Sequence, residues 1–163
     1  MYYRQNVYNR ESAVNYAIKY ALSPNPNYRY FKLVNDTGGD CANFISQCLK
    51  AGGAQMSHNW WYQKGGYSIS WVVANSLYRY LKTNNNGIKA IEVNDLDKLE
   101  LGDIIQYENF NNRIFHSAII TSFTNVNGTR EPLISQHSYD KLNVTYKKSY
   151  PYKMAHFLKI AII

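Results

Sequence analysis

Long apolar runs are missing from this chain of 163 residues. No stretch approaches the roughly 18 apolar residues that a membrane-spanning helix requires. The first residues, Met1 to Asn6, also lack an apolar segment of signal-peptide length. We therefore expect no membrane span. The sequence as given indicates a cytoplasmic protein, or an extracellular one if it is part of a longer chain or is released by lysis.

Blocks of one charge sign are also missing, although the net charge is +7. The 18 Lys and Arg residues are spread thinly, and no basic block is longer than Lys147-Lys148. This distribution favours diffuse attraction to acidic polymers and gives no sign of a nucleic-acid groove, so no nucleic-acid partner is expected. The 16 tyrosines follow no fixed period, so no repeat architecture is indicated. The length suits one monomeric domain over residues 1–163.

Cysteine is scarce, with only Cys41 and Cys48 in the chain. Seven residues along a helix separate two Cα atoms by about 10 Å, which exceeds the roughly 7 Å limit for a disulfide. Both thiols are therefore expected to be free. Together with His116 and His137 they show no metal-ligand spacing, so we expect no metal and no other cofactor.

Cys41 is the candidate nucleophile, because it follows Gly38-Gly39-Asp40 and opens an apolar stripe at helical spacing. The stripe continues through Phe44, Ile45, Cys48 and Leu49. Free backbone N–H groups and the helix dipole favour an anion in a first helical turn. We therefore expect the Cys41 thiol to ionise more readily than a free cysteine of pKa about 8.5. The same stripe is also typical of a buried structural thiol, which is our expectation for Cys48.

The remaining pattern places helices first and strands second. Asn9 or Ser12 can cap a first helix that ends before Pro24, and a third helix is predicted from Ser70 to Leu81. Apolar runs separated by turn-forming residues then predict strands at 88–93, 103–107, 114–123, 132–138 and 155–162. This order predicts an α+β domain in which an antiparallel sheet packs against the Cys41 helix.

His116 is the best-placed base for a nucleophilic cysteine, since it stands near the start of a predicted central strand. A third group should orient its imidazole, and the next strand offers Gln136 and His137 on opposite faces. We expect His137 to be that group. Gln136 and Asp140 remain alternatives, because a register shift of one residue reverses the faces.

The motifs resemble a known family in order and spacing over nearly the whole chain. They are Gly39 to Leu49 (GDCANFISQCL), Ala51-Gly52-Gly53, Ser70-Trp71, Leu101 to Ile105 (LGDII), His116 to Ile120 (HSAII) and Gln136-His137-Ser138. The sequence is similar to the bacterial "putative amidase domain" family, the sixth of the domain families named for amidases. That family is in turn similar to the NlpC and CHAP types of papain-like cysteine peptidase, which cut amide bonds in peptidoglycan peptides.

The resemblance implies a papain-like domain with Cys41 as nucleophile, His116 as base and His137 at the orienting position. It departs from the NlpC type at Ala42-Asn43, where that type has Ser-Gly, and in the longer gap from His116 to His137. The implied reaction is cleavage of a peptide or peptidoglycan-fragment amide bond through a thioester. The alternatives are an amide-forming or acyl-transfer enzyme and a catalytically silent binding module on the same scaffold.

The implied mechanism also needs an oxyanion hole and a binding cleft. The Cys41 backbone N–H is the expected first oxyanion donor, and Tyr30 or Asn35 is a candidate second donor. Asp40 is expected to cap the Cys41 helix or to bind a substrate amino group. Trp60 and Trp61 are candidates to line the cleft. His58 is expected to lie on the substrate side or merely to be exposed, and His156 is expected to be structural.

Overall fold

The computed structural model describes residues 7–35 and 37–163. The helices are α1 (Arg10–Tyr20), α2 (Cys41–Ala51), α3 (Ile69–Val72) and α4 (Ala74–Thr83), with short 3-10 turns η1 (Leu96–Lys98) and η2 (Tyr146–Lys148). The main sheet contains β5 (Ile88–Val93), β6 (Ile104–Glu108), β7 (Ile114–Val126), β8 (Thr129–Gln136), β9 (Lys141–Thr145) and β10 (Met154–Ile162). Two small hairpins pair β1 (Leu33–Val34) with β2 (Thr37–Gly38), and β3 (Tyr62–Gln63) with β4 (Gly66–Tyr67).

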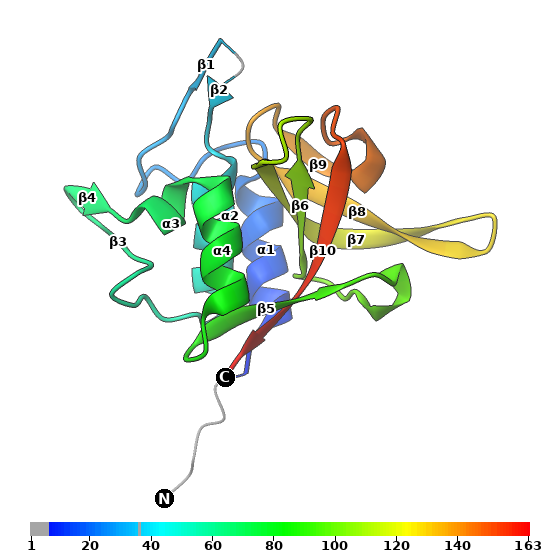
Figure 1. Cartoon of the computed structure of the whole chain (residues 1–163), viewed down its shortest axis with the longest axis horizontal. Coiled ribbons are helices and arrows are strands. Elements are labelled where there is room, and N and C mark those ends of the chain that lie inside the picture. Colours follow the sequence, from blue (N-terminus) through cyan, green and yellow to red (C-terminus); the bar gives the residue numbers. More distant parts are fainter. Residues whose placement is uncertain (1–6, 36) are drawn as a thin grey trace, which may run out of the picture.

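The main sheet has the strand order β5-β10-β6-β7-β8-β9. Every neighbouring pair is antiparallel. Helices α1, α2 and α4 lie together beside this sheet (Figure 1). The predicted α+β class, with an antiparallel sheet packed against the Cys41 helix, is therefore confirmed. No helix in the described part of the chain is long and apolar enough to cross a membrane.

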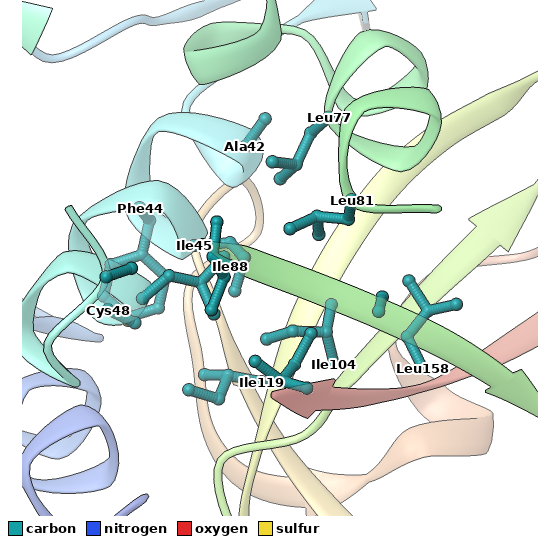
Figure 2. Packing of buried hydrophobic residues seen from close by; sticks show 14 of the residues in the cluster. Ala42, Phe44, Ile45, Cys48, Leu77, Leu81, Ile88, Ile104, Ile119 and Leu158 are labelled. Atoms are coloured by element: carbon teal, nitrogen blue, oxygen red, sulfur yellow. The ribbon is translucent and has the colours of Figure 1, made fainter. Parts of the chain in front are cut away.

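Helix α2 is the most deeply buried helix of the fold, since every residue from Cys41 to Leu49 is buried. Its apolar side chains meet α4 and the sheet in one core, where Figure 2 shows Ile45 beside Ile88 and Cys48 beside Phe44. Cys48 is fully buried there and unpaired, as the sequence predicts. A second core covers the other face of the sheet, around Tyr107 and Tyr146. The sheet is thus covered on both faces, and α2 is held rigidly from its first turn.

Two elements differ from the sequence-based expectation. The helix predicted over 70–81 is broken at Val73, whose extended backbone (φ −114°, ψ 121°) separates α3 from α4. Strand β9 was not predicted, because its five residues, Lys141 to Thr145, show no continuous apolar pattern. The first helix agrees with the prediction, since the Asn9 side chain caps α1 by accepting the Ser12 N–H at 3.0 Å.

The run LGD, which is part of the family resemblance, ties α1 to the sheet. Asp103 is fully buried, and its carboxylate accepts hydrogen bonds from Arg10 at 2.7 Å and from the Ile160 N–H at 2.9 Å. Gly102 has φ +84°, and its carbonyl accepts the Tyr8 hydroxyl at 2.8 Å. This motif therefore secures the start of β6 and does not contribute to the cavity described below.

We expect Arg10→Met to lower the free energy of unfolding by about 3 kcal/mol, because it removes the closer cation of the buried Asp103 carboxylate and leaves only Lys159, at 3.5 Å. Chemical denaturation measures this loss. The exposed Arg79 provides the matched control, since it makes no ion pair with any residue that the structure describes. Arg79→Met removes the same charge and should cost at most about 0.5 kcal/mol. Equal losses in the two variants would contradict a special role for the Arg10–Asp103 pair.

Candidate active site

Cys41 is the first residue of α2, and the backbone before it makes a close turn. Gly39 has φ +100°, and a Cβ at this position would lie 2.3 Å from the Ser138 hydroxyl oxygen. That same hydroxyl accepts the Asp40 N–H at 3.0 Å. Only glycine therefore permits the close approach that joins the start of α2 to the turn after β8.

Asp40 stands at the N-cap position of α2, but its side chain makes no capping hydrogen bond and is instead held by other residues of the protein. Its carboxylate is buried, and one oxygen accepts the Phe31 N–H at 3.0 Å and the Asn43 amide at 2.9 Å. The other oxygen pairs with Nδ1 of His137 at 2.5 Å. The Asp40 side chain therefore caps no N–H group at the start of α2, because its two oxygens are bound to Phe31, Asn43 and His137.

His137 joins α2 to α1 and makes no contact with His116 that would orient it. Its Nε2 lies 2.6 Å from the Tyr20 carbonyl oxygen, and its ring stacks on Phe44 with centroids 4.0 Å apart. Both ring nitrogens are therefore engaged with Asp40 and Tyr20. The expectation that His137 orients His116 is corrected by this geometry.

Gln136 is the side chain that contacts His116, with Oε1 2.8 Å from the imidazole Nε2. The alternation rule holds along β8, so Gln136 and His137 lie on opposite faces of the sheet. His116 pairs in register with Tyr107, which belongs to the core on the far side of the sheet from α2. Gln136 lies on that face, whereas His137 faces α2. The alternative that the sequence left open is the one that the structure adopts.

The Gln136 amide is fixed in orientation by its other hydrogen bonds. Its Nε2 donates to the carbonyl oxygens of Ser138, Tyr139 and Ser149, at 3.0 to 3.3 Å. Its Oε1 therefore faces His116 and also accepts the Ser149 hydroxyl. An oxygen acceptor at 2.8 Å requires that His116 carry its proton on Nε2, which leaves Nδ1 as the basic nitrogen.

The turn after β8 is strained, and Gln136 holds it in place. Ser138 and Tyr139 both have positive φ values, 63° and 55°. Such non-glycine conformations cost on the order of 1 kcal/mol or more each and persist where neighbouring contacts impose them. Both residues line the cavity described next. Gln136 thus contacts the candidate base and shapes the cavity wall at the same time.

Cys41 and His116 line one cavity of about 430 Å³ at the end of the strands. The lining includes Val72, Val73 and Ala74 from the helical part of the chain. Three aromatic residues also line it, Phe115, Tyr139 and Tyr150, and the β1–β2 hairpin adds Leu33 and Gly38. Strand β7 also reaches the thiol directly, because the Ser117 backbone N–H is hydrogen bonded to the Cys41 sulfur. The two candidate catalytic groups are therefore brought to one solvent-accessible space.

Burial makes both groups neutral at pH 7. It raises the pKa of the Cys41 thiol to about 11, although backbone N–H groups of Ser117 and Ala42 oppose the rise. Burial also lowers the pKa of His116 to about 4, and the hydrogen bond that His116 donates to Gln136 opposes that shift in part. The expectation that the helix N-terminus makes Cys41 unusually acidic is therefore wrong, because desolvation of the thiolate outweighs the helix dipole.

The other predicted substrate-binding residues lie outside this cavity. Trp60 is fully buried, donates its ring N–H to Ser46 at 3.1 Å and packs on Trp71 with ring centroids 4.6 Å apart. Trp61 packs over Gly66 in the β3–β4 hairpin. Tyr30 is exposed, with its ring edge towards His137. Trp60 is thus a core residue, and neither Trp61 nor Tyr30 meets Cys41.

The remaining sequence candidates also lie away from the cavity lining. Asn35 and Asp140 are exposed, as is His58. His156 is held between Glu92 and Glu108 across β5, β10 and β6, in agreement with the structural reading. Sequence reasoning missed Phe115, Arg113 and Tyr150 as cavity residues. The available signal was their position, because Phe115 directly precedes His116 and Arg113 stands three residues before it. Residues at the start of one strand lie at the same edge of the sheet.

No group of three or more His, Cys, Asp and Glu side chains within the described residues is arranged to hold a metal ion. The site combines the Cys41 thiol from α2, the His116 imidazole from β7 and the Gln136 amide from β8. Such an arrangement can perform nucleophilic and acid–base chemistry on a carbonyl compound.

The chain belongs to the family described as "Putative amidase domain", whose model matches residues 7–160. It is 36% identical over 140 residues to the uncharacterized protein YhbB of Bacillus subtilis, covering 82% of this chain and 42% of that protein. It is 35% identical over 147 residues to the uncharacterized protein YjcM of the same organism, covering 84% of this chain and 32% of YjcM. The chain thus spans less than half the length of these curated relatives. No solved structure matches it significantly.

Proposed function

We propose that this domain is a cysteine-dependent amidase or endopeptidase of papain-like type, which cleaves amide bonds of peptidoglycan-type peptides through a thioester. The observation that carries the proposal is the shared cavity of Cys41 and His116, with Gln136 bound to the far nitrogen of the imidazole. A nucleophile, a base and a group that orients the base are the parts that amide cleavage by a thiol requires.

The reaction begins from the neutral pair. As the Cys41 sulfur attacks the amide carbonyl, its proton passes to His116, and a C–S bond forms. The C–N bond then breaks, and His116 returns that proton to the leaving amine. Water next attacks the thioester, gives one proton to His116 and releases the acid, and the proton returns to the sulfur. Gln136 stabilises the imidazolium through its oxygen and keeps the ring in one orientation.

The start of α2 supplies the oxyanion donors. Helix N-termini present backbone N–H groups without intrahelical partners, and the Cys41 and Ala42 N–H groups are directed at the sulfur. The Cys41 N–H is the first donor to the developing oxyanion. Neither Tyr30 nor Asn35 is included as a second donor to the oxyanion, since neither residue lines the cavity.

The substrate class rests on the family resemblance and on charge. The net charge of +7 suits an anionic polymer, and no Asp or Glu lines the cavity. An acyl-transfer reaction is equally compatible with the thioester intermediate, because an amine can replace water as the group that attacks it. A silent binding module is disfavoured, since both the nucleophile and the base are present.

The test is incubation with soluble peptidoglycan peptides, with and without hydroxylamine, followed by mass spectrometry. We expect new acid and amine products, and a hydroxamate that forms only in the presence of hydroxylamine, since a thioester reacts with this amine. An added amino acid that appears in the product at the expense of the acid would identify the transferase. Absence of turnover and of any acyl adduct on Cys41 would remove both enzyme readings and leave the binding module.

The pH dependence of the reaction follows from the two shifted pKa values. His116 accepts a proton only when it is unprotonated, so activity should be present above its pKa of about 4 and lost as the pH falls through that value. The Cys41 thiol has a pKa of about 11, so its alkylation by iodoacetamide should rise about tenfold per pH unit from pH 7 to pH 9. Rate constants measured across this range check the point. A plateau below pH 8 would instead indicate a preformed thiolate–imidazolium pair.

A further inference from the structure

The cavity has an unusual charge composition, which the proposed reaction does not use. Among its lining residues, Arg113 is the only one with a formal charge at pH 7, since His116 is neutral there. The other lining side chains are apolar, aromatic or uncharged polar groups. The N-terminus of α2 adds a partial positive charge. No carboxylate lines the cavity, although the buried Asp40 next to Cys41 acts on the thiol through its charge.

Arg113 has no protein partner for its guanidinium within the described residues, which sets it apart from several other basic side chains. Arg10 pairs with Asp103, Lys82 with Glu92 and Lys153 with Glu108. The Arg113 backbone is nevertheless fixed. Its N–H donates to the Asn109 side chain at 3.1 Å, and its carbonyl accepts the Asn109 N–H at 2.9 Å. Arg113 is thus an exposed residue of the cavity lining with an anchored backbone and an unpaired guanidinium.

The short segment between Arg113 and His116 limits how far this guanidinium stands from the chemistry. Arg113 lies just before β7, three residues before His116, and the pairing with β6 is irregular between Ile114 and His116. Three extended residues span at most about 10 Å. The arginine side chain can shorten that separation by several ångströms. A group that it binds would lie on the order of one or two peptide residues from the scissile amide, since an extended residue spans about 3.5 Å.

We propose that Arg113 recognises a carboxylate of the substrate, one or two residues from the amide that Cys41 attacks. Arginine binds carboxylates through two parallel N–H donors, which fixes the orientation of the ligand as well as its charge. The apolar and aromatic walls then hold the intervening part of the substrate. This inference rests on the proposed function for its reaction, but the charge preference of the cavity can be measured without turnover.

The first test compares alkylation of Cys41 by iodoacetate and by iodoacetamide, which differ in one carboxylate. In each reaction an S–C bond forms, iodide leaves and the thiol proton goes to the base. We expect the ratio of the iodoacetate to the iodoacetamide rate constant to fall about fivefold or more in Arg113→Gln, and to recover in part in Arg113→Lys. Raising the salt concentration should lower the wild-type ratio.

Arg79→Gln is the matched control, because it removes the same charge from an exposed position on α4 outside the cavity. Its ratio should stay within about twofold of the wild-type value. An unchanged ratio in Arg113→Gln, or an equal fall in both variants, overturns the proposal. Because no amide is cleaved in this assay, failure of the hydrolase reading does not affect its outcome.

A second test separates a terminal carboxylate from one in the body of the peptide. The probes are L-Ala-γ-D-Glu-L-Lys, its C-terminal amide and its D-isoglutamine form, titrated calorimetrically into Cys41→Ala. We expect one of the two amidated peptides to bind about tenfold more weakly, and Arg113→Gln in the same background to reduce this difference to under about twofold. The proposal is overturned if all three peptides bind equally or if none of them binds. It is also overturned if the preference persists in Arg113→Gln.

Discussion

Replacing Cys41 by alanine is expected to lower kcat/KM for amide cleavage by about a thousandfold or more, because it removes the atom that forms the thioester. Cys41→Ser should be almost as inactive, since neutral His116 is matched to a thiol and not to the far less acidic serine hydroxyl. Steady-state hydrolysis of the peptides found active in the screen measures the loss. The acyl adduct should disappear from Cys41→Ala in the same experiment.

Cys48→Ala is the control for this prediction, because it removes the other thiol from the same helix. Cys48 is fully buried in the core beside Phe44 (Figure 2), and it does not line the cavity. We expect a modest loss of stability from the small void and activity close to that of the parent protein at temperatures where both are folded. An active Cys41→Ala variant would show that the thiol is not the nucleophile and would rule out the proposed mechanism.

Gln136 and His137 are adjacent in sequence, but substitutions at the two positions should have different effects. His137→Ala leaves the buried Asp40 carboxylate without its ring partner and removes the ring that stacks on Phe44. We expect it to lower the free energy of unfolding by about 3 to 5 kcal/mol, the range for breaking a buried ionic pair. Denaturant titration measures this loss.

Gln136→Glu should instead move the pH profile. A carboxylate in place of the amide oxygen stabilises the imidazolium, so the pKa of His116 should rise from about 4 and the acid limb of kcat/KM should move upwards by about one unit or more. The limb moves upwards because activity requires the unprotonated base. His137→Ala should leave the limb in place wherever the variant remains folded. A shifted limb in His137→Ala and an unshifted one in Gln136→Glu would reverse the assignment in favour of His137.

Much of the fold is visible in the sequence because the local signals agree with each other. Asn9 caps α1 as predicted, the stripe after Cys41 forms α2, and the run Ile88 to Val93 forms β5 with the predicted bounds. Local signals fail where backbone conformation is set by distant contacts. The extended residue Val73 lies between two helices that the sequence joins, and it borders the cavity.

The site illustrates the same division. The order of Cys41, His116 and the pair Gln136-His137 along the chain identified the elements that meet, since each stands at the start or end of its element. It did not identify which member of the pair meets the imidazole. The pairing of β7 with β8, in which Ile119 lies opposite Ser135, sets which face each residue shares with His116, and no local pattern encodes that register.

The sequence by itself determined the α+β class, the free thiols and the residues from which a catalytic site can be made, because composition and periodicity are local properties. The tertiary structure alone decided that Gln136 contacts His116, that Asp40 and Trp60 are internal, and that burial keeps Cys41 protonated at pH 7. It also decided that Arg113 is the one charged residue of the cavity lining at that pH. Burial, pKa and pairing across strands depend on what surrounds a residue in space, and that environment is contributed by segments far apart in the chain.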